Sequence, residues 1–237
     1  MKTTRLWALG VVAGALLCHA GSDVAPAATL TPFKIEQTIE VRFPPALLLD
    51  AVTQGDVWVL VSISADGKLT DSLVTRFTHR ALADAAQYAL GKWHYEPARR
   101  DGQAISACGE VHFHFAATGA VVTLNPMSTV ASLTAFVRDV PYITTLCRPD
   151  ELDQPPTAIH TVTPPTPPGS AGGRVVIDFV IDEQGQPRLP VLVSATDSQY
   201  TTLAAAALAQ WKFAPPTRRG QPVAVPARQE FVFTARP

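Results

Sequence analysis

The sequence has no apolar run of the roughly 20 residues that a bilayer-spanning helix needs, which argues against a transporter with several membrane spans. Charge is also scarce, because charged residues make up 16% of the 237 and 19 basic residues face 20 acidic ones. Without a basic surplus, a nucleic-acid-binding protein is not expected. The apolar fraction of 47% is still enough for a buried core in one or two domains.

Motifs that carry catalytic chemistry are missing as well. The sequence contains no G-x-S-x-G turn, no phosphate-binding glycine loop and no H-E-x-x-H helix. Its acidic residues show no spacing that would pair two carboxylates for acid–base work. We therefore expect no enzyme activity and no cofactor.

The first twenty residues differ from the rest of the chain. A basic start is followed by an uncharged apolar stretch at residues 6–17, and Cys18 and Ala20 place small residues at positions −3 and −1 of a cut after residue 20. We expect residues 1–20 to be a signal peptide that exports the protein to the periplasm. The alternative is an uncleaved anchor in the inner membrane, for which twelve apolar residues are short.

Cysteine is rare beyond that segment, where only Cys108 and Cys147 occur. In an exported protein two cysteines can form a disulfide, and this one would close a loop of about forty residues and stabilise the fold by about 3–4 kcal/mol. Two buried, unpaired thiols are the alternative of equal weight. Neither cysteine lies in a sequence context typical of a catalytic nucleophile.

The chain contains an internal repeat at an offset of 118 residues. This offset separates Trp93 from Trp211 and aligns the flanking segments without a gap. Other identical pairs at the same offset are Gly55 and Gly173, Ile63 and Ile181, Gly67 and Gly185, Pro97 and Pro215, Gly102 and Gly220, Phe113 and Phe231, and Phe115 and Phe233. Chance does not keep so many Trp, Pro, Gly and Phe matches in order. We therefore predict two copies of one small domain, at residues 33–120 and 169–237.

Both copies predict the same order of elements. An alternating apolar run predicts a strand, a glycine turn predicts a hairpin into a second strand, apolar spacing near 3.6 predicts a helix, and renewed alternation predicts a last strand. These patterns lie at 57–63, 66–67, 72–75, 82–93 and 111–115 in the first copy, and at 175–181, 184–185, 190–194, 200–211 and 229–233 in the second. The predicted class is α+β, each copy being a three-stranded antiparallel sheet with one packed helix.

A Trp-x-aromatic-x-Pro motif follows each predicted helix, as Trp93, Tyr95 and Pro97 in the first copy and as Trp211, Phe213 and Pro215 in the second. We expect the two tryptophans to be core anchors rather than a ligand platform. Together with the glycine hairpin and the entry Phe43-Pro44-Pro45-Ala46, this motif resembles the C-terminal domain of TonB energy transducers. The resemblance covers about residues 40–116 and 150–235.

The resemblance implies binding of outer-membrane receptor peptides by strand addition, in energy-coupled transmembrane transport. By analogy we assign partner binding to the edge of each last strand, at Val111, His112 and Phe113 and at Gln229, Glu230, Phe231, Val232 and Phe233. An uncleaved N-terminus would add an inner-membrane proton-motive complex as partner, although no long Pro/Lys/Glu spacer precedes the first copy. The alternative function is a structural envelope scaffold that self-associates, for instance as a dimer, through its sheet edges.

The segment between the copies, residues 121–168, has a different composition. Ser128 can cap a short helix over residues 128–137. Six prolines between residues 155 and 168 then predict an extended spacer rather than packed structure. A Pro-rich recognition ligand is the less favoured alternative.

Only two of the six histidines form an arrangement, His112 and His114, which lie two apart on one face of a predicted strand. Such a pair can chelate a metal if a third ligand such as His94 or Glu110 joins it. The second copy has Glu230 and Val232 at the equivalent positions. We therefore predict a solvated strand face and no metal site.

Overall fold

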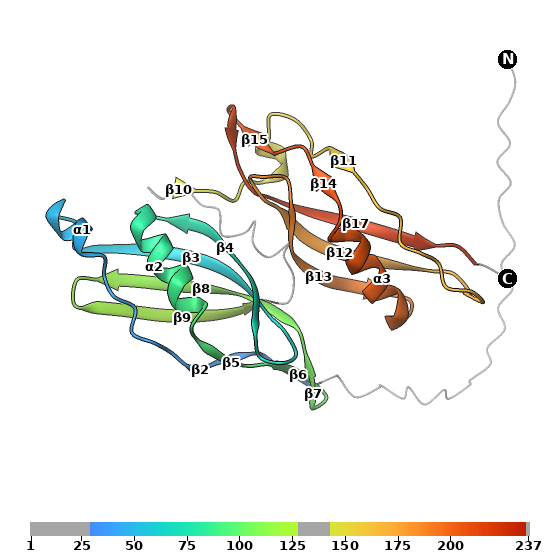
Figure 1. Ribbon diagram of the computed structural model, residues 1–237, viewed down its shortest axis with the longest axis horizontal. Coiled ribbons are helices and arrows are strands. Elements are labelled where there is room, and N and C mark those ends of the chain that lie inside the picture. Colours follow the sequence, from blue (N-terminus) through green and yellow to red (C-terminus); the bar gives the residue numbers. More distant parts are fainter. Residues whose placement is uncertain (1–28, 128–142, 236–237) are drawn as a thin grey trace, which may run out of the picture.

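The computed structural model describes residues 29–127 and 143–235. The signal peptide predicted at residues 1–20 and the helix predicted over 128–137 lie outside the described residues. Within the described ranges, no helix is both long enough and apolar enough to cross a membrane. The two copies of the repeat form two α+β units that lie next to each other (Figure 1).

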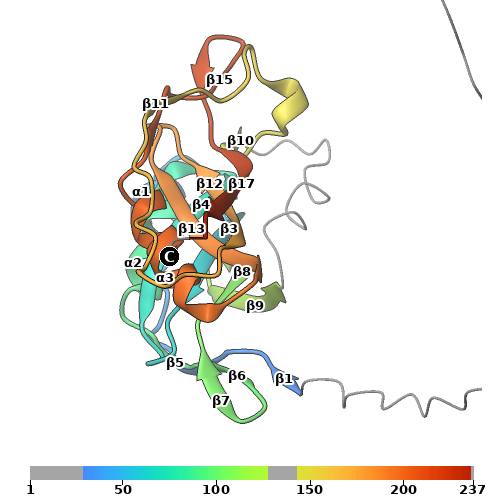
Figure 2. The same cartoon turned by 90° about the vertical axis from the view of Figure 1, so that its right-hand side faces the viewer.

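The first unit is a five-stranded antiparallel sheet in the order β10-β4-β3-β8-β9, with helix α2 (Arg80–Leu90) on one face. Its strands are β3 (Gln54–Ile63), β4 (Leu69–Phe77), β8 (Ala107–Ala116), β9 (Gly119–Met127) and β10 (Ile143–Thr144). Smaller elements are β1 (Leu30–Thr31), β2 (Lys34–Gln37), α1 (Pro45–Leu49), β5 (His94–Glu96), β6 (Ala98–Arg100) and β7 (Gln103–Ile105). In both views the β6–β7 hairpin projects from this unit (Figures 1 and 2), and β1 pairs with β6.

The second unit is a three-stranded antiparallel sheet in the order β13-β12-β17, covered by helix α3 (Ser198–Leu208). Its strands are β12 (Gly173–Ile181), β13 (Pro187–Ala195) and β17 (Val225–Phe233). Smaller elements are the 3-10 turn at Pro149–Glu151, β11 (Ala158–His160), β14 (Lys212–Phe213), β15 (Thr217–Arg218) and β16 (Gln221–Pro222). The predicted α+β class is therefore confirmed. The predicted three strands match the second sheet. The first sheet has two more strands than predicted, β9 and β10.

Each unit buries its own core between the helix and one sheet face. In the first unit Leu82, Ala86 and Leu90 on α2 are fully buried, as the 3.6-residue spacing predicts. The facing strand β3 turns every second residue inward, among them Val57 and Val61, which are fully buried too. The second unit repeats this packing with the side chains that α3 and β12 contribute to its core.

The segment predicted to be an unpacked spacer contributes to the second unit. Strand β11 pairs with β14, and the indole Nε1 of Trp211 donates to the carbonyl of Val162 at 2.9 Å. The first unit has the same arrangement, since β2 pairs with β5 and Trp93 Nε1 donates to Ile39 O at 3.3 Å. The prediction of an unpacked spacer is thus wrong for residues 158–162, because this extended segment pairs with β14 and supplies the acceptor for the half-buried indole N–H.

The two cysteines are free thiols in the structure, so the Cys108–Cys147 disulfide is not formed. Cys147 is held on the second unit, where its backbone N–H donates to Ala224 O at 2.8 Å. Cys108 lies on β8 of the first unit, opposite Ser62. Burial raises the pKa of both thiols to about 11, which makes them poor nucleophiles at neutral pH.

An apolar cluster and a network of ion pairs dock the units on each other. Leu60 of the first unit packs with Val180 and Leu189 of the second. Beside them Arg188 donates from Nε to an oxygen of Asp71 at 3.0 Å, and its second nitrogen also bonds that carboxylate. The backbone N–H of Leu189 donates to Asp71 at 3.2 Å. One carboxylate on β4 therefore fixes two successive residues of β13.

Replacing Asp71 with asparagine should destabilise the protein by about 1–3 kcal/mol, because the partly buried Arg188 loses its main counter-ion. Asp84→Asn is the matched control. Its carboxylate pairs with Arg80 at 3.1 Å on the exposed side of α2, where a salt bridge contributes about 0.5 kcal/mol or less. Urea denaturation of both variants measures the difference. Equal losses would mean that Asp71 does not hold the units together.

Candidate partner-binding edge

Strand β17 has one neighbour among the described residues. It pairs antiparallel with β12 from Gly173 opposite Phe233 to Ile181 opposite Val225. The sheet order places β17 at the end of its sheet, as the ribbon shows (Figure 1). A sheet ending in this way presents a row of backbone donors and acceptors to whatever lies beside it.

Two hydrogen bonds identify the backbone groups of β17 that point outward. Thr196 N donates to Arg174 O at 3.0 Å and Arg174 N donates to Thr196 Oγ1 at 3.1 Å, so both groups of Arg174 face β13. The backbone N–H and C=O groups of successive residues point to opposite sides of a strand. The groups of Val175 therefore face β17, where Val175 lies opposite Phe231. The groups of Phe231 are thus used by β12. Those of its neighbours Glu230 and Val232 point to the open edge.

A proline lies at the start of the open edge, and a side chain of β17 already bonds one of the outward carbonyls. Pro226 occupies the first outward position of β17 and has no N–H to offer. Further along, the side-chain amide of Gln229 donates to Glu230 O at 2.6 Å, which provides for an outward carbonyl. Val232 is 66% exposed. Three outward N–H groups remain for a partner, at residues 228, 230 and 232.

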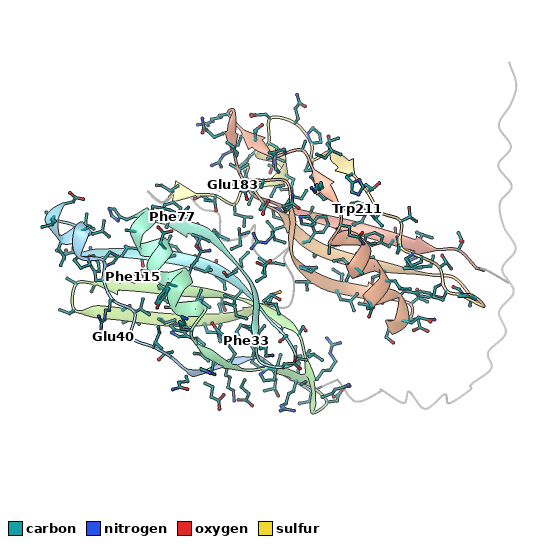
Figure 3. The ribbon with its side chains drawn as sticks, in the orientation of Figure 1. Phe33, Glu40, Phe77, Phe115, Glu183 and Trp211 are labelled. Atoms are coloured by element: carbon teal, nitrogen blue, oxygen red, sulfur yellow. The ribbon has the colours of Figure 1, made fainter. Side chains whose placement is uncertain are left out.

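The inward side chains of β17 hold the edge in place. Phe231 and Phe233 are buried, and they contact the Trp211 and Tyr200 rings at centroid distances of 5.4 and 4.5 Å. Figure 3 shows Trp211 beside α3, where the chain leaves the helix and enters β14. Phe213 of the same motif is buried, Trp211 is half-buried and Pro215 is exposed. The edge is therefore rigidly supported from the core side.

The motif of the first unit is more deeply buried. Trp93 is 6% exposed and its ring lies 5.4 Å from that of Phe113. Tyr95 donates from its buried hydroxyl to Leu90 O at 2.8 Å, and burial raises its pKa well above the usual value. Pro97 is half-buried. These residues close the end of α2 onto the sheet.

The equivalent edge of the first unit is occupied. Strand β9 runs back along β8 and pairs with it from Ala116 opposite Gly119 to Cys108 opposite Met127 (Figures 1 and 2). Val111, His112 and Phe113 therefore lie on an interior strand between β3 and β9, and the prediction of an edge there is wrong. The physical reason is that the residues just after position 120, where the predicted linker begins, continue a strand whose inward side chains Ala120, Val122 and Leu124 pack on the first core.

The histidine pair meets a residue that the sequence did not single out. His112 Nε2 and His114 Nδ1 lie 2.8 and 2.9 Å from the same oxygen of Asp56, on the neighbouring strand β3. Trp58 stacks on His112 with the ring centroids 4.3 Å apart. Only the register of β3 against β8 brings these side chains together, which no local pattern reveals.

His94 and Glu110, the third ligands considered from the sequence, do not join the histidine pair. Glu110 pairs with Arg76 at 3.5 Å, and burial raises the pKa of its carboxyl, although Arg76 and His112 oppose that shift. His94 lies on β5, outside the large sheet. Across residues 29–127 and 143–235 no group of three or more His, Cys, Asp or Glu side chains is arranged to hold a metal ion.

Two tandem α+β units with an equivalent helix, an equivalent Trp motif and the same order of their three shared strands define a repeat of one domain class. A family model, that of the Gram-negative bacterial TonB protein C-terminal domain, matches residues 39–117 and 170–235. The chain belongs to this family, and the two matched segments agree with the two copies. The family is a non-enzymatic module of the Gram-negative envelope that serves energy-coupled transport. A search of curated proteins finds no match.

Proposed function

We propose that this protein is a periplasmic TonB-like module that binds extended segments of outer-membrane receptors along β17, in energy-coupled transport. The observation that carries the proposal is the difference between the two units. In the first, the outward groups of the last strand are paired with β9, whereas in the second they have no strand beside them among the described residues. Membership of the TonB family supports the receptor as partner.

The energetics favour a partner that adds side-chain contacts to the backbone ladder. Three outward N–H groups and their carbonyls contribute about 0.5–1.5 kcal/mol for each bond formed with a partner strand. This total suits a transient complex, and affinity beyond it must come from side chains beside Val232 and at the rim of the second core. Reversible binding is what a module needs if it engages receptors in turn.

A second candidate is a structural scaffold in which two copies of the chain pair through β17. The exposed Val232 favours it, because the edge leaves an apolar side chain in water. Sedimentation separates the candidates. A monomer at micromolar concentration supports receptor binding, whereas a stable dimer that Val232→Pro disrupts supports the scaffold.

The proposed location depends on processing after residue 20. We expect the exported protein to begin at or shortly after Gly21 and to fractionate with the periplasm in a Gram-negative host, which mass spectrometry of its N-terminus will check. An intact Met1 terminus in the membrane fraction would instead support an anchored transducer coupled to an inner-membrane proton-motive complex.

Val232→Pro should weaken binding of receptor N-terminal peptides about two- to tenfold, because it removes one of the three outward N–H groups of the open edge, each of which contributes about 0.5–1.5 kcal/mol. Val232→Ala is the matched control, since it truncates the side chain but keeps the N–H. Val193→Pro places a proline on β13, the opposite edge of the same sheet, at a residue 39% exposed. Isothermal titration measures all three variants after far-UV circular dichroism and a cooperative melt have shown that they are folded. A folded Val232→Pro protein that binds as tightly as wild type would overturn the proposal.

A further inference from the structure

We infer that residues 143–147 form a strap that holds the two units together, and that the strap and the Asp71–Arg188 ion pair open and close as one device. The first unit keeps a fixed orientation relative to β17 only while both are closed. This inference goes beyond the proposed function and does not depend on receptor binding. It is carried by the hydrogen bonds of Thr145 and by the apolar cluster between the units.

Thr145 is bonded to both units at once. Its backbone N–H donates to Thr75 O at 3.0 Å and its hydroxyl donates to Val74 O at 2.7 Å, which fixes it to β4 of the first unit. Its carbonyl accepts from the N–H of Ala224, in the second unit, at 2.7 Å. Two residues further on, Cys147 N donates to Ala224 O at 2.8 Å. The strap thus begins beside β4 and continues onto the second unit (Figure 1).

The strap holds the chain just before β17. Ala224 precedes Val225, the first residue of β17, and forms an isolated parallel bridge with Leu146. Counting alternate residues back from Val232 and Glu230 places Ala224 in the series whose backbone groups point away from β12. The strap therefore occupies the position directly ahead of the open edge, and a displacement of the strap frees the leading end of β17.

The strap also supplies part of the apolar cluster between the units. Five buried residues form this cluster, namely Leu60 of the first unit, Leu146 of the strap, and Val180, Leu189 and Ala224 of the second unit. It is much smaller than the core of either unit. Separation of the units therefore costs less free energy than unfolding of either one, so the docked and the released arrangement can both keep two folded units.

The ion pair and the strap contact this cluster through different residues. Asp71 binds Arg188 and also accepts from the backbone N–H of Leu189 at 3.2 Å, and the side chain of Leu189 lies in the cluster. The strap enters the same cluster through Leu146, which is 3% exposed. Opening either element admits water to the shared cluster and weakens the other. A coupling of this kind is reciprocal.

Amide hydrogen exchange on the full chain measures the two elements separately. Asp71→Asn weakens the ion pair and leaves the strap residues unchanged, and the amides of Ala224 and Cys147 report on the strap. We expect these two amides to exchange at least about tenfold faster than in wild type. Thr145→Pro removes the N–H that bonds β4 and releases the strap. The amide of Leu189, which bonds Asp71, should then exchange faster by a similar factor.

Two further variants serve as controls. Thr163→Pro places a proline at an exposed residue of the second unit and should leave the exchange of Leu189 and Ala224 unchanged. Thr145→Val keeps the backbone N–H and loses only the hydroxyl bond to Val74 O. It should accelerate Leu189 by a smaller factor than Thr145→Pro, and it replaces that variant if far-UV circular dichroism shows that the proline prevents folding.

The pattern of exchange decides between coupled and independent elements. Acceleration confined to the strap amides in the Thr145 variants, and to Leu189 in Asp71→Asn, would overturn the inference. Equal acceleration of the amides of β3 and β12 would mean that the units unfold rather than separate, and would overturn it too. The proposed function would stand in both cases, because receptor binding at the open edge is measured independently with Val232→Pro.

Discussion

Trp93→Ala should destabilise the first unit by about 3–5 kcal/mol, because the truncation leaves a cavity between α2 and the sheet. The indole is 6% exposed, packs on Phe113 and donates to Ile39 O, so the change removes apolar contacts and also the hydrogen bond to Ile39 O. Chemical denaturation followed by far-UV circular dichroism measures the loss.

Two other aromatic residues serve as comparisons for the stability loss expected of Trp93→Ala. Trp211 is the repeat counterpart, and because it is half-buried, Trp211→Ala should cost less than Trp93→Ala. Tyr88 lies on the outer side of α2 with 67% of its surface exposed, so Tyr88→Ala should cost about 0.5 kcal/mol or less. A Trp93→Ala loss under about 1 kcal/mol would place the ring outside the core and contradict the packing described here.

Gly185→Ala should be comparably damaging, for a backbone reason. Gly185 has φ +78° in the β12–β13 hairpin, and a Cβ at this position would lie only 2.0 Å from the carbonyl oxygen of Phe213. The same glycine accepts a hydrogen bond from Phe213 N at 2.8 Å, so the strand that follows α3 is held directly against the turn. We expect a loss of about 3 kcal/mol or more, from left-handed strain together with displacement of that strand.

Gly220 provides the control for this glycine. It has a similar φ of +74°, but a Cβ there would meet nothing within 4 Å. Gly220→Ala should therefore destabilise the protein by the left-handed strain alone, about 1–2 kcal/mol. Thermal unfolding of both variants isolates the contribution of the close approach. Equal losses would mean that the hairpin relaxes away from Phe213 at little cost.

Most of the fold could be predicted because its signals are local. Alternation in β3 and β12, the helical stripes of α2 and α3 and the glycine turns each depend on residues within one element, and the repeat offset doubles every signal. Pattern also anticipated β17 as a last strand. Whether such a strand lies at an edge is decided by what pairs beside it, and that is not a property of its own sequence.

The features missed by sequence reasoning depend on residues far apart in the chain. Strand β9 shows clear alternation, yet its position next to prolines and polar residues made it look like part of a linker. Asp71 and Arg188 are 117 residues apart, and Asp56 reaches His112 only through the β3–β8 register. Long-range pairing of this kind follows from the assembled sheet and cannot be read from spacing.

Amide hydrogen exchange on the complex with a receptor peptide tests strand addition at β17 most directly. The geometry assigns the N–H groups of Arg228, Glu230 and Val232 to the open edge, and that of Phe231 to β12. We predict that the three outward amides exchange fast in the free protein and become protected on binding, while Phe231 is protected in both states. A saturated complex in which Arg228, Glu230 and Val232 still exchange as in the free protein would contradict the account.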